Sequence, residues 1–183
     1  MLPFEGSGAT GCPRLRRLGE ADLPEIERHL LGLDLVDRNA RSHSGFGDAA
    51  VTTYVRGLDF AVGILVGATQ GPSKRILGLA EAHPAGAPRT VELAVSVLVT
   101  HRRRGLGRRL LAHALELAFA AGADAAELHC SPGKRHLMRI AMALGAPPGP
   151  TNEGRAVIHN CLARSPGTSW EPLQSGIPDN RWV

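Results

Sequence analysis

The chain has 183 residues, of which 43% are hydrophobic and 21% charged, values typical of one globular domain large enough to bury a core. The formal net charge of +4 mildly favours anionic ligands but does not by itself indicate nucleic-acid binding. The three cysteines are too few for a disulfide framework, and no Cys-x-x-Cys pair suggests zinc. No stretch resembles a secretory signal or a membrane span. We therefore expect a cytoplasmic protein with no metal site and no membrane partner, of an oligomeric state that the sequence does not indicate.

The N-terminal part predicts a strand followed by a helix. Residues 1–13 are rich in Gly and Pro and are expected to be loose, and residues 14–18 form a short strand. Asp22 is the expected N-cap of a helix that has Pro24 in its first turn. The apolar positions of this helix recur at helical spacing (Leu23, Ile26, Leu30 and Leu31).

In the middle of the chain the spacing of apolar residues changes from that of helices to that of strands. Residues 34–47 are polar and show no clear pattern, after which Asp48 is expected to cap a short helix that ends at Gly57. Three strands joined by short turns are predicted next, as an antiparallel meander, with the strands at 59–66, 76–82 and 91–99 and the turns at 67–73 and 84–88. In the last strand the odd positions, from Val91 to Val99, share one face, and Glu92, Ala94, Ser96 and Leu98 share the other.

The C-terminal part predicts a helix between parallel strands. The helix runs from about 105 to 121 and ends at Gly122, and its apolar stripe is expected to be buried (Leu106, Leu110, Leu111, Ala114, Leu115 and Ala118). A strand at 125–130, a helix capped at 131–133 and ended by Gly145, and a strand at 156–163 follow. A strand, helix and strand in succession form a βαβ unit, so the sheet is expected to be mixed.

A turn rich in arginine and glycine is expected between the strand at 91–99 and the helix after it. Arg102-Arg103-Arg104-Gly105-Leu106-Gly107 fits the pattern Gln/Arg-x-x-Gly-x-Gly/Ala. Glycines let the backbone approach a ligand closely, and the N–H groups at the start of a helix bind anions. The guanidinium groups can add charge-assisted hydrogen bonds. The turn therefore predicts a site for a pyrophosphate group.

This turn and its surroundings resemble the acyl-CoA-binding motif of the GNAT superfamily of N-acetyltransferases. The strand Glu92-Leu93-Ala94-Val95-Ser96-Val97 before the turn is also similar to that family, as is the segment 138–146 with its Leu-Gly pair. The resemblance covers about residues 14–163 and is strongest over 91–146. It implies an α/β (α+β) fold, with a mixed, mostly antiparallel central sheet flanked by helices. The acyltransferase domain would span 14–163, between loose terminal segments at 1–13 and 164–183.

The resemblance also implies a co-substrate and an acceptor. The co-substrate is acetyl-CoA, and the acceptor is an amine on a small molecule or a protein lysine. Main-chain groups of Val97, Leu98 and Val99 would hold the pantetheine arm like a short extra strand, beside a divergence of two strands. The residues expected to bind the diphosphate lie in the turn and the first turn of the helix (Arg102, Arg103, Arg104, Gly105, Leu106, Gly107 and Arg108).

Other interpretations of the turn fit the residues less well. A dinucleotide-binding Gly-x-Gly-x-x-Gly motif would need glycine at Leu110, and no Walker lysine follows a glycine loop. A basic turn that merely faces solvent is the simplest alternative. Arginines occupy positions 102–104, 108 and 109, but no aromatic residues are interleaved with them, so nucleic acid is not expected as a partner.

Glu92 is the predicted catalytic residue. Acetyl transfer needs a neutral amine, and a carboxylate near the amine can accept its proton. Glu92 shares a strand face with Ala94 and Ser96, where the family often has a catalytic glutamate. The alternative is a glutamate at the start of a strand that faces solvent.

The acid that protonates the leaving thiolate stays open. Many family members use a tyrosine in the helix that here spans 133–144, and this segment has none. Ser131, Cys130 and His136 are the candidate substitutes, although Cys130 also fits a small buried residue at a strand end. A thiolate can also leave without enzymatic help. His129 and His101 are either pH-sensitive bases or ordinary hydrogen-bonded residues.

The acceptor half of the chain gives weaker signals. The segment 33–43 and the next helix resemble protein-lysine acetyltransferases only loosely, because Ser42 follows Arg41 where an aromatic residue is usual. Acidic residues could attract a cationic acceptor, but such residues more often cap helices or face solvent (Glu20, Asp22, Asp34, Asp37 and Asp48). Arg135 replaces a frequent asparagine, and both it and Arg139 either reach the cofactor or face water. A non-catalytic domain that senses acyl-CoA is the alternative function.

Overall fold

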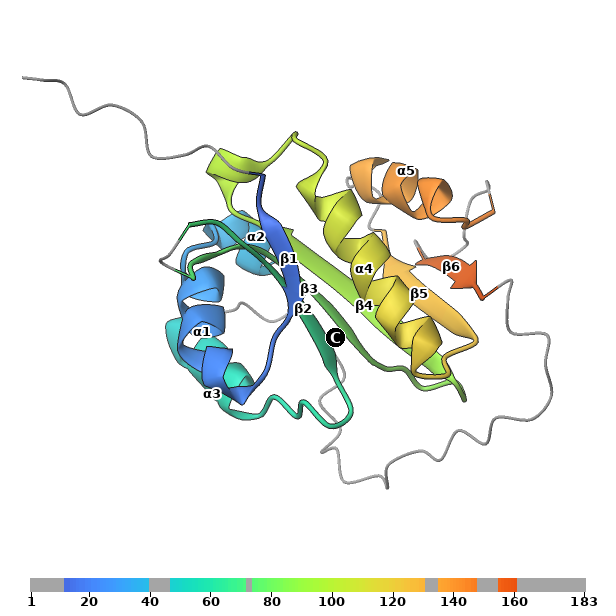
Figure 1. The fold of residues 1–183 in the computed structure, drawn as a ribbon, viewed down its shortest axis with the longest axis horizontal. Coiled ribbons are helices and arrows are strands. Elements are labelled where there is room, and N and C mark those ends of the chain that lie inside the picture. Colours follow the sequence, from blue (N-terminus) through green and yellow to red (C-terminus); the bar gives the residue numbers. More distant parts are fainter. Residues whose placement is uncertain (1–11, 40–46, 72–73, 131–134, 148–154, 161–183) are drawn as a thin grey trace, which may run out of the picture.

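The computed structural model describes residues 12–39, 47–71, 74–130, 135–147 and 155–160. A six-stranded sheet forms its centre, with the strands in the order of the chain (Figure 1). Among the strands of the described residues, only β4 and β5 are parallel, as predicted for a mixed, mostly antiparallel sheet. The strands are β1 (Arg14–Arg17), β2 (Ile64–Thr69), β3 (Ile76–Pro84), β4 (Thr90–Val97), β5 (Ala125–His129) and β6 (Arg155–His159).

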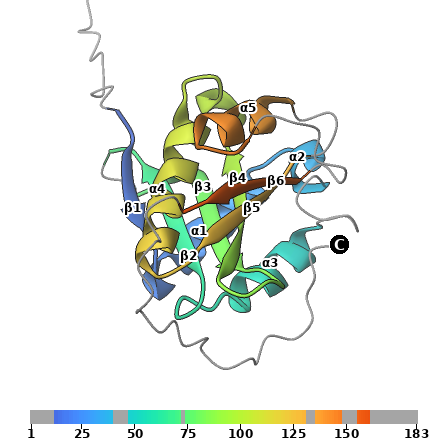
Figure 2. The same cartoon turned by 90° about the vertical axis from the view of Figure 1, so that its right-hand side faces the viewer.

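Helices cover both faces of the sheet. Figure 2 shows α4 (Leu106–Ala120) on one side of the strands and α2 (Leu35–Asn39) and α3 (Asp48–Arg56) on the other. On the α4 side, α5 (Arg135–Ala143) contributes Leu137 and Ala141 to the same buried cluster. On the opposite side, α1 (Leu23–Leu31) packs with α3. Two short 3-10 turns, η1 (Glu20–Asp22) and η2 (Val99–His101), precede α1 and follow β4. None of the helices described is long and apolar enough to cross a membrane.

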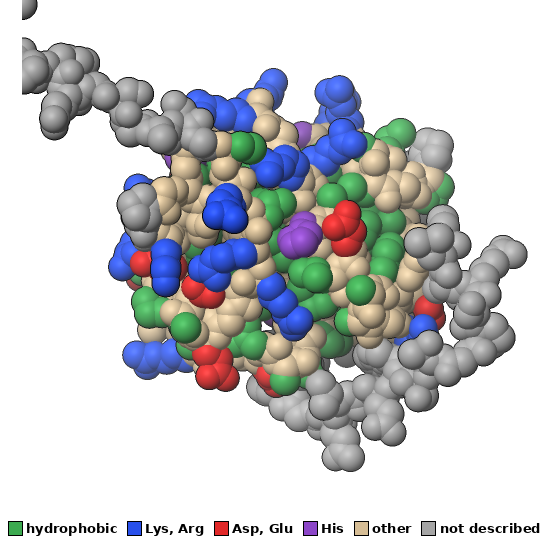
Figure 3. Space-filling view, in the orientation of Figure 1, with side chains coloured by type: hydrophobic (Ala, Val, Ile, Leu, Met, Phe, Trp, Pro, Cys, Tyr) green, Lys and Arg blue, Asp and Glu red, His purple; other side chains and the backbone are tan. Residues whose placement is uncertain are grey.

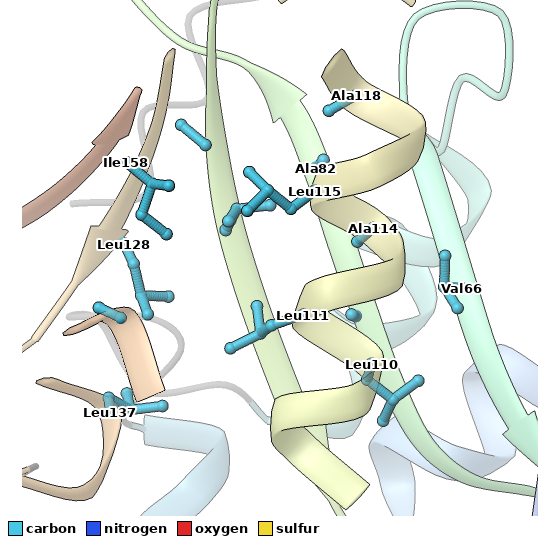
Figure 4. Packing of buried hydrophobic residues seen from close by; sticks show 14 of the residues in the cluster. Val66, Ala82, Leu110, Leu111, Ala114, Leu115, Ala118, Leu128, Leu137 and Ile158 are labelled. Carbon is cyan, nitrogen blue, oxygen red and sulfur yellow. The ribbon is translucent and has the colours of Figure 1, made fainter. Parts of the chain in front are cut away.

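The larger core lies between α4 and the sheet (Figure 4). All six residues of the apolar stripe predicted for this helix are buried, which confirms its orientation. They pack against side chains such as Val66, Ala82 and Leu128 from the strands. Gly78 on β3 makes this close contact possible, because a Cβ there would lie 2.7 Å from Cδ1 of Leu110. Helix α4 is therefore fixed on the sheet with its N-terminus at the end of β4.

The second core lies on the other face. Ile26 and Leu30 of α1 and Val51 of α3 pack on Leu65 and Leu79 of the sheet. With only 4% aromatic residues in the chain, Leu, Ile, Val and Ala make most of both clusters. On β4, Ser96 faces this side, with its hydroxyl 2.9 Å from Nε2 of His29 on α1, and the odd positions 91–97 face α4, as the alternation of the strand predicts.

Two predicted strands have wrong boundaries. The strand expected at 59–66 begins at Ile64 and continues to Thr69, into residues expected to turn. Asp59 starts a turn instead, because its side chain accepts a hydrogen bond from Ala61 N at 2.8 Å. The strand expected to reach Val99 ends at Val97, and Val99 begins η2 with its side chain 59% exposed.

Of the two predicted caps within the described residues, Asp22 has the predicted N-cap position without the capping hydrogen bond, and Asp48 does not cap its helix. Asp48 is the first residue of α3 rather than its cap, and its carboxylate pairs with Arg38 at 2.5 Å. Asp22 occupies the N-cap position of α1 without capping it. Its two oxygens accept hydrogen bonds from the guanidinium of Arg16 at 2.6 and 2.8 Å, and one of them also accepts Gly19 N at 3.1 Å. Both carboxylates pair with a guanidinium, and Asp22 keeps a local hydrogen bond, from Gly19 N at the start of η1.

We expect Asp22→Asn to destabilise the fold at neutral pH and not in acid. The hydrogen bonds from Arg16 are the main cause that lowers the pKa of Asp22 below its usual value. The stabilisation is therefore present above the unfolded pKa of about 4 and is lost as the pH falls through the lower folded pKa. Because Arg16 is 38% exposed, the loss should be only about 0.5–1 kcal/mol. Urea unfolding at pH 7 and pH 2.5 measures it, and an equal difference at both values would contradict the assignment.

Candidate active site

Strands β4 and β5 pair over only half the length of β4. The register joins Thr90–Leu93 to Ala125–Leu128 and ends there. On its other edge β4 stays paired with β3 as far as Val97. Beyond Leu93, the edge of β4 that faced β5 is therefore open in the described structure. Such an edge presents main-chain donors and acceptors that an extended ligand can use.

The direction of the main-chain groups identifies the residues that line this open edge. Leu98 N donates to Leu77 O at 2.9 Å, so the N–H of Leu98 points toward β3. Because successive residues of a strand alternate, the N–H and C=O groups of Val95 and Val97 point the other way, toward the open edge. Among the residues predicted to hold the pantetheine arm, Val97 is therefore well placed. Val95, which was not among the predicted residues, lies on the same open edge, and only the pairing of the strands shows this.

The start of α4 lies directly over this edge. A Cβ at Gly107 would lie 3.7 Å from Cγ2 of Val97 and 4.0 Å from Cγ2 of Val95. The first helical hydrogen bond runs from Arg109 N to Gly105 O at 3.1 Å, and no side chain caps the helix. The N–H groups of Leu106, Gly107 and Arg108 precede that bond and have no acceptor within the helix. They form a set of donors suited to an anion.

The backbone of the turn is held in an unusual conformation. Gly105 has φ +74° and Arg103 has φ +60°, both in the left-handed region. Glycine adopts this region freely, whereas a residue with a side chain pays about 1–2 kcal/mol. A strained non-glycine residue of this kind is commonly found at functional sites.

The arginines of the turn and first helical turn divide into two groups. Arg103, Arg104 and Arg108 are exposed, and Figure 3 shows basic side chains gathered along the edge of the molecule where α4 begins. Arg102 instead turns inward. Its Nε donates to Val97 O at 2.8 Å, and its Nη2 donates to Asp37 of α2. The guanidinium predicted to bind phosphate is thus held by this chain's own groups.

Glu92 lies on the opposite face of the sheet, just before the strands diverge. Its side chain is 34% exposed, and one carboxylate oxygen lies 3.7 Å from Nε2 of His129. In the register it stands between His83 on β3 and Glu127 on β5. Glu127 pairs with Arg155 at 3.1 Å. Glu92 therefore lies half-buried among titratable groups rather than fully in solvent.

A second polar cluster on this face was missed by sequence reasoning. Glu81 of β3 is only 1% exposed, accepts a hydrogen bond from the hydroxyl of Tyr54 on α3, and lies 3.3 Å from Nε2 of His83. Gly63 makes room for the imidazole, because a Cβ there would lie 2.9 Å from Nδ1 of His83. The available signal was a single charged residue within the apolar run Ile-Leu-Gly-Leu-Ala-Glu-Ala.

We expect Tyr54→Phe to destabilise the protein by about 1–2 kcal/mol, because the buried carboxyl of Glu81 loses one donor. Thr53→Ala is the matched control, since that hydroxyl is exposed and bonds only the carbonyl of Ala49 one turn earlier in α3. It should change stability by less than about 0.5 kcal/mol. Equal effects of the two substitutions in urea unfolding would show that the Tyr54–Glu81 contact contributes no special stability.

The remaining predicted residues occupy varied positions. Cys130 is buried in the larger core, which favours the structural interpretation, and Nδ1 of His101 lies 2.9 Å from the hydroxyl of Thr100. The side chains of α5 at 135, 136 and 139 are exposed. Ser131, the expected cap at 131–133 and the terminal segments 1–11 and 164–183 lie outside the described residues. No cluster of three metal-binding side chains occurs within the described ranges.

Three of the acidic residues that could attract a cationic acceptor form ion pairs with arginines of this chain, namely Asp22, Asp37 and Asp48. Asp34 lies 3.7 Å from Arg102 and accepts a hydrogen bond from Asp37 N at the start of α2. Helix-capping and structural ion pairs therefore account for these carboxylates.

A mixed sheet that opens beside a glycine-rich helix N-terminus is the arrangement that the resemblance to the GNAT superfamily predicts. The sequence matches the acetyltransferase (GNAT) family over residues 36–145, more than half of the chain. The protein therefore belongs to this family and is an acyltransferase. The family uses acetyl-CoA.

Solved structures share the fold at low sequence identity. The GNAT domain of PAT from S. lividans is 20% identical, with a TM-score of 0.68 over 82% of this chain and 92% of that one. A chimera of the spermidine N-acetyltransferase SpeG from Vibrio cholerae and hSSAT is 17% identical, with a TM-score of 0.59 over 81% and 96%. yncA from Salmonella typhimurium, solved with acetyl-CoA, is 16% identical, with a TM-score of 0.58 over 74% and 80%. No curated protein matches the sequence.

Proposed function

We propose that this protein transfers an acetyl group from acetyl-CoA to an amine by direct attack within a ternary complex. The observation that carries the proposal is the open edge of β4 beneath the uncapped start of α4. An extended pantetheine arm can pair with the N–H groups of Val95 and Val97, while the diphosphate meets the N–H groups at 106–108. The exposed arginines 103, 104 and 108 add positive charge at the same end.

The chain residue expected to take part in the chemistry is Glu92. In the reaction the amine nitrogen bonds to the thioester carbon, the carbon–sulfur bond breaks, and the sulfur leaves with its electron pair. The amine must lose one proton, and Glu92 is proposed to accept it directly or through a water molecule. His129, 3.7 Å away, lies where β5 leaves β4 and lines the same face. The position of Glu92 on the face opposite α4 supports this proposed role, because an acceptor amine could approach from that side.

Calorimetry with acetyl-CoA and the folded protein tests the first half of the proposal. We expect saturable binding that weakens about 10-fold in Arg104→Ala, equivalent to about 1.4 kcal/mol, because one charge-assisted contact is lost. Arg56→Ala is the matched control, since Arg56 is an exposed arginine at the far end of α3. It should bind like the unaltered protein. Absence of any heat with acetyl-CoA would overturn the assignment.

A thiol-release assay across an amine panel tests the second half. The panel should include spermidine, which a structural neighbour is named for, and lysine-containing peptides. Release of CoA that depends on one amine class identifies the acceptor. Binding without release for any amine would favour a domain that only senses acyl-CoA, an alternative motivated by the lack of tyrosine in α5.

A further inference from the structure

Arg102 joins two parts of the molecule that are far apart in sequence. Its Nε donates to Val97 O at 2.8 Å, and its Nη2 donates to Asp37 and lies 3.7 Å from Asp34. Its side chain is 34% exposed and that of Asp37 33%, so both are partly withdrawn from solvent. The other arginines predicted to bind the diphosphate are exposed. Arg102 therefore differs from its neighbours in both direction and partners.

The carbonyl that Arg102 holds belongs to the open edge of β4. Because Leu98 N points toward β3, the preceding carbonyl of Val97 points away from β3. It lies at the end of the edge, immediately before the turn. Arg102 thus occupies one of the main-chain acceptors nearest the predicted path of the cofactor arm.

The carboxylates that Arg102 holds belong to the acceptor half of the fold. Asp37 lies in α2, which connects α1 to α3 along the chain. Arg38 ties the same helix to its neighbours, because it donates to the carbonyls of Leu31 and Leu33 and pairs with Asp48 at the start of α3. Movement of α2 would therefore be transmitted to both α1 and α3.

We propose that Arg102 is a positioning residue that fastens α2 to the cofactor turn, and is not a ligand of the cofactor phosphates. This role rests on the proposed function. Acetyl-CoA bound at the turn would hold Arg102 in place and, through its guanidinium, would further restrict the motion of α2. The charge of Arg102 is already opposed by Asp37 and Asp34, so it adds little attraction for a phosphate.

The direction in which Asp37→Asn changes the affinity for acetyl-CoA distinguishes a phosphate-binding role of Arg102 from a positioning role. If Arg102 binds phosphate, Asp37→Asn releases the guanidinium and tightens acetyl-CoA binding. If Arg102 fastens α2, the same substitution loosens the turn and weakens binding. We expect calorimetry to show a loss of about 5-fold to 10-fold in Asp37→Asn and in Arg102→Ala, the lower range of measured couplings between sites. The double variant should lose no more than either single one, because both remove the same link.

Two controls exclude simpler explanations. Asp124→Asn removes a similar arginine partner, since Asp124 pairs with Arg89 at 2.7 Å before β5, and should leave affinity unchanged. Arg102→Lys keeps the charge but has a single terminal nitrogen in place of separate Nε and Nη donors, so it should not restore binding. Melting temperatures without acetyl-CoA show whether each variant is folded.

Hydrogen exchange measures directly how acetyl-CoA binding at the turn affects α2. Acetyl-CoA should slow exchange of the α2 amides in the unaltered protein and leave them unchanged in Arg102→Ala. Tighter or unchanged acetyl-CoA binding in Asp37→Asn, full rescue by Arg102→Lys, or equal protection of α2 in Arg102→Ala would each overturn the proposal. If the unaltered protein bound no acetyl-CoA, the proposed function itself would fail instead.

Discussion

Gly107→Glu should abolish measurable acetyl-CoA binding, with a loss of at least about 100-fold, or about 2.7 kcal/mol. The position lies in the first turn of α4, over Val95 and Val97 at the open edge. A glutamate there brings negative charge to the donors expected to hold the diphosphate and fills the approach to them. Calorimetry and competition with free CoA measure the effect.

Gly107→Ala is the control that distinguishes a loss of acetyl-CoA binding caused by negative charge from one caused by disturbed packing of α4. Its Cβ would lie 3.7 Å from the nearest atom, an ordinary van der Waals distance, so the helix should form unchanged. An acidic residue in the first turn of a helix is itself favourable to the helix dipole, so Gly107→Glu should also keep its melting temperature. A loss of acetyl-CoA binding with no loss of stability is therefore expected. Retained affinity in a folded Gly107→Glu variant would remove the start of α4 from the cofactor site.

Glu92→Gln should lower kcat by about 100-fold to 1000-fold, within the range that general base catalysis contributes. The amide keeps the shape and one acceptor of the carboxylate but accepts a proton poorly. Acetyl-CoA affinity should stay within about 2-fold, because Glu92 lies on the face of the sheet opposite α4. Steady-state kinetics with the acceptor found in the amine panel, together with calorimetry, measures both quantities.

Glu127→Gln is the informative comparison for Glu92. The two residues are direct neighbours across β4 and β5, but Glu127 is held by Arg155. We expect its substitution to lower kcat by less than about 10-fold, with the remaining effect arising from the lost ion pair. A larger loss in Glu127→Gln than in Glu92→Gln would transfer the proposed role to Glu127.

Patterns within single elements could be read from the sequence. The apolar stripe of α4, the two faces of β4 and the order of strand, turn and helix around Arg102–Gly107 were predicted and are present. These features depend on periodicities of 3.6 and 2 residues and on the conformational freedom of glycine, which are local properties. The same local signals led to the resemblance to the GNAT family, which the family match confirms.

Element ends were less predictable because distant partners compete for the same side chains. Asp22 and Asp48 have the residue type of helix caps, yet Arg16 and Arg38 hold their carboxylates. A guanidinium six or ten residues away offers a stronger hydrogen bond than a neutral backbone N–H does. The tendency of aspartate to cap helices is a local property, so it does not include competition from an arginine elsewhere in the chain.

The geometry of the site was decided only by the tertiary structure. The divergence of β4 and β5 after Leu93 depends on the register of two strands joined through a whole helix. Arg102 meets Asp37 across 65 positions, and Tyr54 meets Glu81 across 27. The sequence by itself determined that a turn rich in arginine and glycine follows a strand and begins a helix with a buried apolar stripe. Which arginine turns inward and which carboxyl is buried depended on how the sheet brings separate segments together, because contacts of this range arise only when the chain is folded.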